Sequence, residues 1–214
     1  MDLKVYTHQE YKRYCLAEGS QHIVSEFALF QILKLIQKYN IKKILEVGVG
    51  IGTISGSILM YSRLEDLSLK VSGTEANSFC LNQIPQNLNG DYNQMNLYRD
   101  VRDLPNEEEY ELVIIDGGEN NLLEIKRKLV RCGIVVIEGD RADQVELVRK
   151  IFPRSRYVQL ISLERNGEYS VKNTDDYQGG LKVIFTDPTI RHHFHWLKLK
   201  IITKLDFYNR KISK

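Results

Sequence analysis

Short apolar segments alternate with segments of helical periodicity along most of this 214-residue chain. The strongest of them, ELVIID and GIVVIEG, consist largely of Ile, Leu and Val, as expected for strands that are buried on both faces. The segments predicted as strands are residues 42–47, 70–75, 95–99, 111–116 and 133–139. Strands that alternate with helices form right-handed βαβ units, so the chain should fold into a parallel sheet between two layers of helices.

Apolar residues spaced three or four positions apart predict the helices. These helices span 22–38, 53–61 and 77–87, and two more follow the stripes Leu122, Ile125, Leu129 and Val145, Val148, Ile151. Two later extended segments, 156–164 and 180–186, have no helical pattern between them, so they should pair antiparallel at one edge of the sheet. The predicted fold class is α/β: a Rossmann-like, doubly wound, mostly parallel sheet of seven strands in a three-layer αβα arrangement.

The composition is that of a soluble globular protein, with 43% hydrophobic and 27% charged residues. No apolar run is long enough to span a membrane, and the N-terminal residues lack the apolar core of a secretory signal. The three cysteines have neither metal-ligand nor CxxC spacing. We therefore expect reduced thiols and a cytoplasmic location, with peripheral membrane contact left open.

The charges are divided unevenly along the chain. Residues 191–214 carry seven Lys or Arg and one acid, whereas the rest of the chain has 23 bases and 27 acids. This asymmetry suggests two roles. We predict a main domain over residues 1–187, with a helical cover over about 1–40, and a basic amphipathic tail over 188–214.

The tail has the pattern of an amphipathic helix. Its apolar residues recur at intervals of three or four: Phe194, Leu197, Ile201, Leu205, Tyr208 and Ile212. Lys198, Lys204 and Lys211 lie off this stripe, and Trp196 adds an aromatic of the kind found at membrane interfaces. Such a helix can dock on its own domain, join a homodimer, lie on an anionic membrane or contact RNA. The sequence leaves these alternatives open.

A glycine-rich turn follows the first predicted strand, in the stretch ILEVGVGIGTISGSIL. Gly48, Gly50 and Gly52 allow close backbone approach, and the helix start that follows offers free N–H groups, so the turn is suited to a nucleotide-like ligand. The dinucleotide fingerprint GxGxxG is absent, because its third glycine would fall on Thr53 or Ser55. No phosphate-binding GxxxxGK[ST] sequence is present either.

Four acidic residues lie at the ends of consecutive predicted strands: Glu46, Glu75, Asp100 and Asp116. In an open α/β sheet, ligands bind beyond the carboxyl ends of the strands, where the strand order reverses. A glycine turn alone could be a tight connection. Four acids at the same edge of the sheet favour a binding site.

The pattern E-x-G-x-G-x-G, with an acid about 25 residues later, resembles motif I of the class I S-adenosylmethionine-dependent methyltransferases. The resemblance covers roughly residues 21–186 and includes the stretches LVIIDGG and GIVVIEGDR at the expected intervals. It implies a seven-stranded sheet whose last strand is antiparallel, which agrees with the two final extended segments. It also implies S-adenosyl-L-methionine as cofactor.

The resemblance further implies a set of cofactor-binding residues. They are Glu46, Gly48, Gly50, Gly52, Glu75, Asp100, Val101 and Asp116. The glycines would line the amino-acid end of the cofactor with Glu46 close by, and Glu75 would accept hydrogen bonds from both ribose hydroxyls. Asp100 and Val101 would border the adenine, and Asp116 would lie near the methionine moiety and the sulfonium.

The stretch after the fourth strand bears on the methyl acceptor. It reads Asp116-Gly117-Gly118-Glu119 in place of the [ND]PP[YFW] motif of enzymes that methylate base amino groups, and no Pro-Cys pair is present for cytosine C5 chemistry. The layout is most similar to the small O-methyltransferases of catechol type, in which an acid and an Asp-Asn pair hold a divalent metal. Here Gly139 and Asp140 replace that pair, so a divalent metal is possible but not favoured.

VVIEGDR is also similar to methyltransferases of sugar and antibiotic pathways, whose acids face a carbohydrate hydroxyl. The predicted catalytic residues are therefore Asp140 as base or orienting group, Asp116, and Arg141 as substrate anchor. His22 could line the acceptor pocket or serve in packing. We predict O-methylation of a small-molecule or saccharide hydroxyl. An RNA methyltransferase that uses the basic tail and a non-catalytic cofactor-binding module are the alternatives, although the acidic body disfavours nucleic acid.

Overall fold

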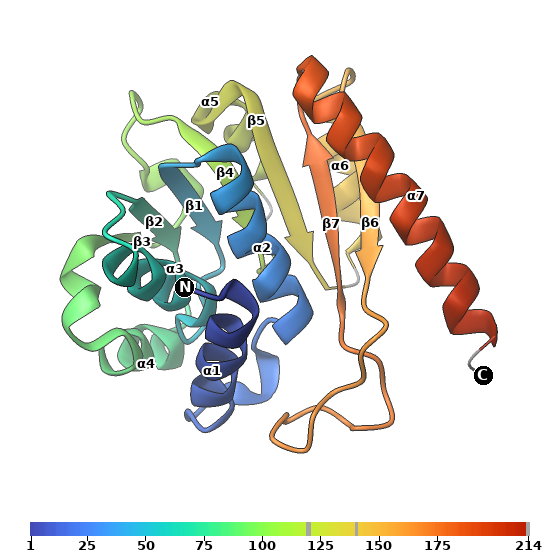
Figure 1. Cartoon of the computed structure of the whole chain (residues 1–214). Helices are drawn as coiled ribbons and strands as arrows, with labels where there is room; N and C mark the ends of the chain where they lie inside the picture. Colours follow the sequence, from blue (N-terminus) through green and yellow to red (C-terminus); the bar gives the residue numbers. More distant parts are fainter. Residues whose placement is uncertain (119–120, 140, 213–214) are drawn as a thin grey trace.

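The computed structural model describes residues 1–118, 121–139 and 141–212. A seven-stranded sheet lies between two layers of helices, in the order β3-β2-β1-β4-β5-β7-β6 (Figure 1). The strands are β1 (Lys43–Val47), β2 (Lys70–Thr74), β3 (Met95–Tyr98), β4 (Tyr110–Ile115), β5 (Leu129–Glu138), β6 (Arg156–Ile161) and β7 (Gly180–Phe185). All seven overlap the predicted segments, which confirms the predicted fold class.

Strand β7 alone runs against the others. It pairs antiparallel with both β5 and β6, whereas the pairs among β3, β2, β1, β4 and β5 are parallel. The strand order reverses between β1 and β4, since the chain proceeds outward from β1 to β3 and then returns to β4 on the other side. The carboxyl ends of β1 and β4 therefore flank the switch point, where ligands bind in such sheets.

Seven α-helices surround the sheet in the described part of the chain. They are α1 (Leu3–Cys15), α2 (Glu26–Tyr39), α3 (Thr53–Leu64), α4 (Ser78–Leu88), α5 (Ile125–Lys128), α6 (Ala142–Ile151) and α7 (Ile190–Ile212). Several helices have a side-chain cap at their N-terminus. Ser25 accepts a hydrogen bond from the Ala28 N–H at the start of α2, and Asn77 accepts from the N–H groups of Phe79 and Cys80 at the start of α4.

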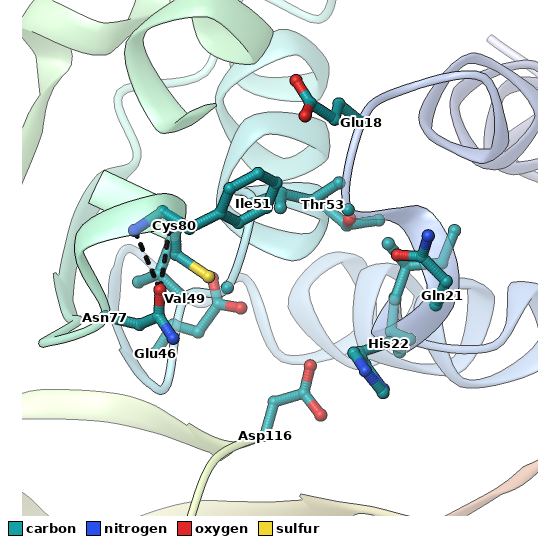
Figure 2. Close-up of a pocket in the computed structure, with 15 residues that line it drawn as sticks. Glu18, Gln21, His22, Glu46, Val49, Ile51, Thr53, Asn77, Cys80 and Asp116 are labelled. Carbon is teal, nitrogen blue, oxygen red and sulfur yellow. Dashed lines mark hydrogen bonds between the residues drawn. The ribbon is translucent and has the colours of Figure 1, made fainter. Parts of the chain in front are cut away.

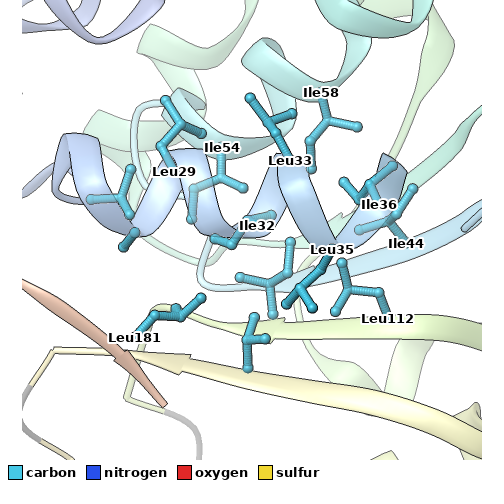
Figure 3. Packing of buried hydrophobic residues seen from close by; sticks show 14 of the residues in the cluster. Leu29, Ile32, Leu33, Leu35, Ile36, Ile44, Ile54, Ile58, Leu112 and Leu181 are labelled. Carbon is cyan, nitrogen blue, oxygen red and sulfur yellow. The ribbon is translucent and has the colours of Figure 1, made fainter. Parts of the chain in front are cut away.

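The core has two parts, one on each face of the sheet. Alternation along the strands separates them: Ile44 and Leu112 point to one face, and Leu45 and Val113 to the other. On the first face, α2 lies over the centre of the sheet. Figure 3 shows its buried apolar residues between those of α3 and those of the sheet. The labelled α2 residues are Leu29, Ile32, Leu33, Leu35 and Ile36.

The segment 122–129 differs from the prediction of a helix with the stripe Leu122, Ile125, Leu129. The structure has a 3₁₀ turn at Leu122–Glu124, a single turn of helix in α5, and Leu129 as the first residue of β5. The reason is pairing at the edge of β4: Leu129 lies opposite Tyr110, and the ladder shifts register before Leu112. Long-range pairing here outweighs a local helical pattern of only two turns.

Helix α7 is docked on the sheet by one face only. It packs against β6 on the same side of the sheet as α2 (Figure 1). Across the part of the chain that the structure describes, no helix is both long and apolar enough to cross a membrane.

Candidate functional site

The ends of three neighbouring strands are joined by backbone hydrogen bonds at the switch point. The Val47 carbonyl at the end of β1 accepts from the N–H groups of Asp116 (2.9 Å) and Gly117 (3.1 Å), which follow β4. Gly48 N donates to the Thr74 carbonyl at the end of β2 over 3.0 Å. Gly48 has φ +86°, and a Cβ there would lie 2.5 Å from the Gly117 Cα. Only glycine fits this position, both for conformation and for space.

Gly50 lies at the open part of the same turn. Its φ is +57°, and among the described residues, apart from Gly50 and its two chain neighbours, no atom lies within 4 Å of the place where a Cβ would stand. It borders a cavity of about 390 Å³ that also reaches Glu46 and Asp116. Gly52 differs from Gly50, because it packs against Leu88, caps α3 and borders neither this cavity nor its neighbour. Of the three predicted glycines, Gly50 alone borders this cavity.

Glu75, directly after β2, is held by backbone N–H groups. Its Oε1 accepts from Ala76 N (2.9 Å) and Asn77 N (2.8 Å), and its Oε2 accepts from Gly50 N (2.7 Å). The carboxylate borders a second cavity of about 370 Å³ together with Gly48. A carboxylate offers about four acceptor positions and three are used here, so this fixed group retains about one for a hydroxyl of a ligand.

Glu46 is a buried acid with one oxygen left unpaired. Its side chain is 0% exposed, and Oε2 accepts from the N–H (2.9 Å) and the hydroxyl of Ser55 at the start of α3. Its Oε1 has no hydrogen-bond partner among the described residues, although the residue borders the first cavity. Burial raises the pKa of this carboxyl well above its ordinary value, and the charges of Asp116 and Glu75 act in the same direction. Within the described part of the chain, the site therefore lacks a donor next to Glu46 Oε1.

Asp116 follows β4 and faces the same cavity. Burial raises its pKa well above the ordinary value, the nearby Glu138 carboxylate adds to the rise, and Arg141 opposes it. The guanidinium of Arg141 lies 3.6 Å from the Asp116 carboxylate and also donates to two carbonyls, those of Asp116 (2.7 Å) and Glu138. Arg141 thus ties the end of β4 to the end of β5, and these bonds use much of its capacity to anchor a substrate.

The second cavity lies on the β2–β3 side of the turn. Asp100 borders it and is paired with Arg102 at 2.8 Å, and hydrogen bonding to Arg102 lowers the pKa of Asp100 to about 2. Val101 does not reach this cavity: its side chain is 0% exposed and lies in the core beneath. Of the two residues expected beside an adenine, the structure therefore presents only Asp100 to the cavity.

Comparison with solved structures identifies the fold. An O-methyltransferase from Bacillus cereus, in complex with SAH, is 14% identical over 85% of this chain and 90% of its own, with a TM-score of 0.60. An O-methyltransferase from Streptomyces achromogenes involved in tomaymycin synthesis, in complex with SAM, is 12% identical over 87% and 90%, with a TM-score of 0.58. The chain has the class I methyltransferase fold.

A third solved structure has the same fold and a different methyl acceptor. A precorrin-6y C5,15-methyltransferase from Geobacter metallireducens is 18% identical over 79% of this chain and 92% of its own, with a TM-score of 0.55. The class I methyltransferase fold thus includes proteins with different methyl acceptors. No protein-family model and no curated protein matches the sequence.

The predicted residue Asp140 lies outside the described residues, next to Gly139 (φ +75°). Within residues 1–118, 121–139 and 141–212, no group of three His, Cys, Asp or Glu is arranged to hold a metal ion. Lys182 of β7 is buried at this end of the sheet and donates to the Gly139 carbonyl. The sequence did not single out Lys182, because a lysine within a strand is ordinarily an exposed residue.

The N-terminal cover contributes cavity residues that the motif did not indicate. Glu18, Gln21 and His22 come from the turn before α2, and Phe79 and Cys80 come from the start of α4. Figure 2 shows the His22 ring and the Asp116 carboxylate pointing toward the same part of the cavity. His22 was expected either to line the acceptor pocket or to serve in packing, and it borders the cavity. Nothing in the sequence pointed to Glu18 or Gln21, because helical periodicity says nothing of which polar side chains face a ligand.

Replacing Glu46 by Gln should change how stability depends on pH. Because the pKa of Glu46 is raised in the folded protein, its contribution to stability is fully present below the unfolded value of about 4.5 and is lost as pH rises through the folded value. A glutamine side chain at this position would not titrate. The unfolding free energy of Glu46→Gln, relative to the unsubstituted protein, should therefore increase from about pH 4.5 toward neutral pH. Denaturant titrations at several pH values measure this difference, and a difference that stays flat or decreases would contradict it.

Proposed function

We propose that this protein is an S-adenosylmethionine-dependent methyltransferase that methylates the oxygen of a small-molecule or saccharide hydroxyl. The observation that carries the proposal is the buried Oε1 of Glu46, unpartnered among the described residues, at the wall of a cavity beside an open glycine turn. An unpaired buried carboxylate oxygen is costly unless a ligand supplies a donor. The ammonium group of the cofactor's methionine moiety is such a donor.

The remaining residues fit the other parts of this cofactor. Glu75 would accept hydrogen bonds from the ribose hydroxyls, the Gly50 backbone would contact the methionine moiety, and the cavity that Asp100 borders would hold the adenine. When bound, the cofactor supplies an electrophilic methyl group on a sulfonium. The chain's task is then to align the acceptor with that group and to exclude water.

Asp116 and His22 are the residues that we expect to act on the methyl acceptor. Transfer to a hydroxyl requires removal of its proton, and a base works best when its pKa lies near the working pH. Burial and Glu138 raise the pKa of Asp116 toward that range, and Arg141 fixes its position. Asp116 is therefore our candidate base, with His22 positioned to contact the acceptor. The role predicted for Asp140 remains a prediction. A cytoplasmic location is part of this proposal, supported by three unpaired cysteines.

Removal of the Glu75 carboxylate should weaken cofactor binding. Glu75→Ala should bind S-adenosylmethionine about 1.5–3 kcal/mol more weakly than the unsubstituted protein, the scale of losing charge-assisted hydrogen bonds. Calorimetric titration measures this loss. Glu107→Ala, which removes an exposed acid far from the turn along the chain, is the matched control and should bind normally. Unchanged affinity in a folded Glu75→Ala protein would remove Glu75 from the site, and binding of NAD in place of the methyl donor would refute the proposal.

Incubation with methyl-labelled cofactor and a panel of phenols, catechols, monosaccharides and nucleosides tests the reaction itself. We expect label on an acceptor oxygen, and a loss of about a hundredfold or more in Asp116→Asn, the range for removal of a general base. Label on RNA, with strong dependence on salt, would replace the proposal by the RNA alternative. Cofactor binding without transfer to any member of the panel would favour the non-catalytic module.

The reaction should not require a divalent metal. Gly139 stands where the catechol-type enzymes carry a carboxylate ligand, so we expect the same initial rate with a chelator as with added magnesium or manganese. The measurement is the rate on whichever acceptor the panel identifies. A strict metal requirement that is lost in both Asp116→Asn and Asp140→Asn would show that these two carboxylates form a metal site.

A further inference from the structure

Helix α7 is attached to the body along one line of residues. His192, Trp196, Leu199 and Thr203 recur at intervals of four, three and four, and each is buried or half-buried against the sheet. The Trp196 indole donates to the Tyr157 carbonyl of β6 over 2.8 Å. Near the end of the helix, Arg210 donates to the Ser162 carbonyl over 2.7 Å. The helix is therefore held to the body over most of its length.

The opposite line of α7 is apolar and faces away from the body. Each of its residues is large, and each is between 51% and 77% exposed. They are Ile190, Phe194, Leu197, Ile201, Leu205, Tyr208 and Ile212, named here the outer stripe. The outer stripe contains the apolar residues that the sequence indicated. Trp196 is not part of it, because its ring packs on the body.

The charges beside the outer stripe have a single sign. Lys204 and Lys211 lie along one side of it and Lys198 along the other, and all three are exposed. The only acid of α7 is Asp206, which lies on the body side and borders a cavity with Glu26. Burial accordingly raises the pKa of Asp206. Over the described length of α7, no acidic side chain is therefore available on its outward half to pair with these lysines.

This charge pattern decides among the surfaces that could cover the outer stripe. In a two-fold dimer built on the outer stripe, the basic flanks of both helices would come together, and α7 has no acid on its outward half to offset them. RNA phosphates would pair with the lysines, but the seven apolar side chains of the outer stripe would then face a charged polymer without an apolar partner. An anionic lipid surface accepts both features, since apolar side chains enter the acyl boundary while lysines reach the phosphates.

We propose that the outer stripe of α7 docks the protein on an anionic lipid surface, with the helix lying in the plane of the membrane. A helix of 23 residues is roughly 35 Å long at about 1.5 Å per residue, and the line through Trp196 and Thr203 stays on the protein body. Arg210 places the end of α7 beside residue 162, at the carboxyl end of β6. That is the same edge of the sheet as the carboxyl ends of β1, β2 and β4 (Figure 1). Docking through α7 would thus fix the orientation of this edge of the sheet relative to the membrane surface.

The test is co-sedimentation of the full chain with vesicles of equimolar phosphatidylcholine and phosphatidylglycerol. We expect binding that weakens with salt and is much weaker on phosphatidylcholine alone. The double variant Ile201→Ser/Leu205→Ser should lower the partition coefficient at least about tenfold, since each fully buried leucine or isoleucine contributes on that scale. Each of Lys198→Gln and Lys204→Gln should lower it about fivefold, the equivalent of ~1 kcal/mol per base near the surface.

Matched controls separate docking from folding. Leu64→Ser/Leu123→Ser removes two exposed apolar side chains outside α7 and should bind vesicles normally. Trp196 is the only tryptophan, so its fluorescence reports whether α7 remains docked in each variant. Cofactor affinity should be unchanged in the outer-stripe variant, which keeps this proposal separate from the proposed enzymatic function. Absence of vesicle binding, equal binding by both double variants, a dimer that buries the outer stripe, or RNA binding that competes with lipid would each overturn it.

Discussion

The close contact between the turns after β1 and β4 is the constraint on which the site depends. Val47 accepts hydrogen bonds from both residues that follow β4, and Gly48 in turn donates to the end of β2. Gly48 and Gly117 carry no Cβ, and this allows the ends of three strands to lie in one compact group. Glu46, Glu75 and Asp116 are the residues at those ends. Glu46 is fully buried there, and both its burial and the charges of Asp116 and Glu75 raise its pKa.

The fold could be predicted from the sequence because its signals are local and agree with one another. Buried strands such as 111–116 are almost wholly apolar, and α2 repeats its core residues at helical spacing. The predicted secondary structure is wrong where pairing with a distant strand determines the conformation. Leu129 continued a helical stripe in the sequence, yet it begins β5 because it lies opposite Tyr110. Such pairing is not encoded within a window of neighbouring residues.

The site was predictable only in part, for a similar reason. Motif I located Gly50, Glu46 and Glu75, because strand ends in a parallel sheet meet at one edge. It could not show that Val101 turns into the core, or that His22 comes from the cover to face Asp116. For α7, the sequence contains two lines of residues at helical spacing, one through Trp196 and one through Ile201. Only the docked position tells which of them faces the body.

Among the described residues, Glu46 Oε1 has no hydrogen-bond partner, and this has a consequence for the lifetime of the protein. A ligand that donates to it binds only the folded chain, and such binding adds stability that grows with the logarithm of ligand concentration. A protein without that ligand would unfold more readily than one that has bound it. Cellular abundance of the protein would then follow the supply of that ligand, because proteases remove unfolded chains first. The Glu46 carboxyl would thereby make the cellular amount of the protein depend on the concentration of the ligand that it binds.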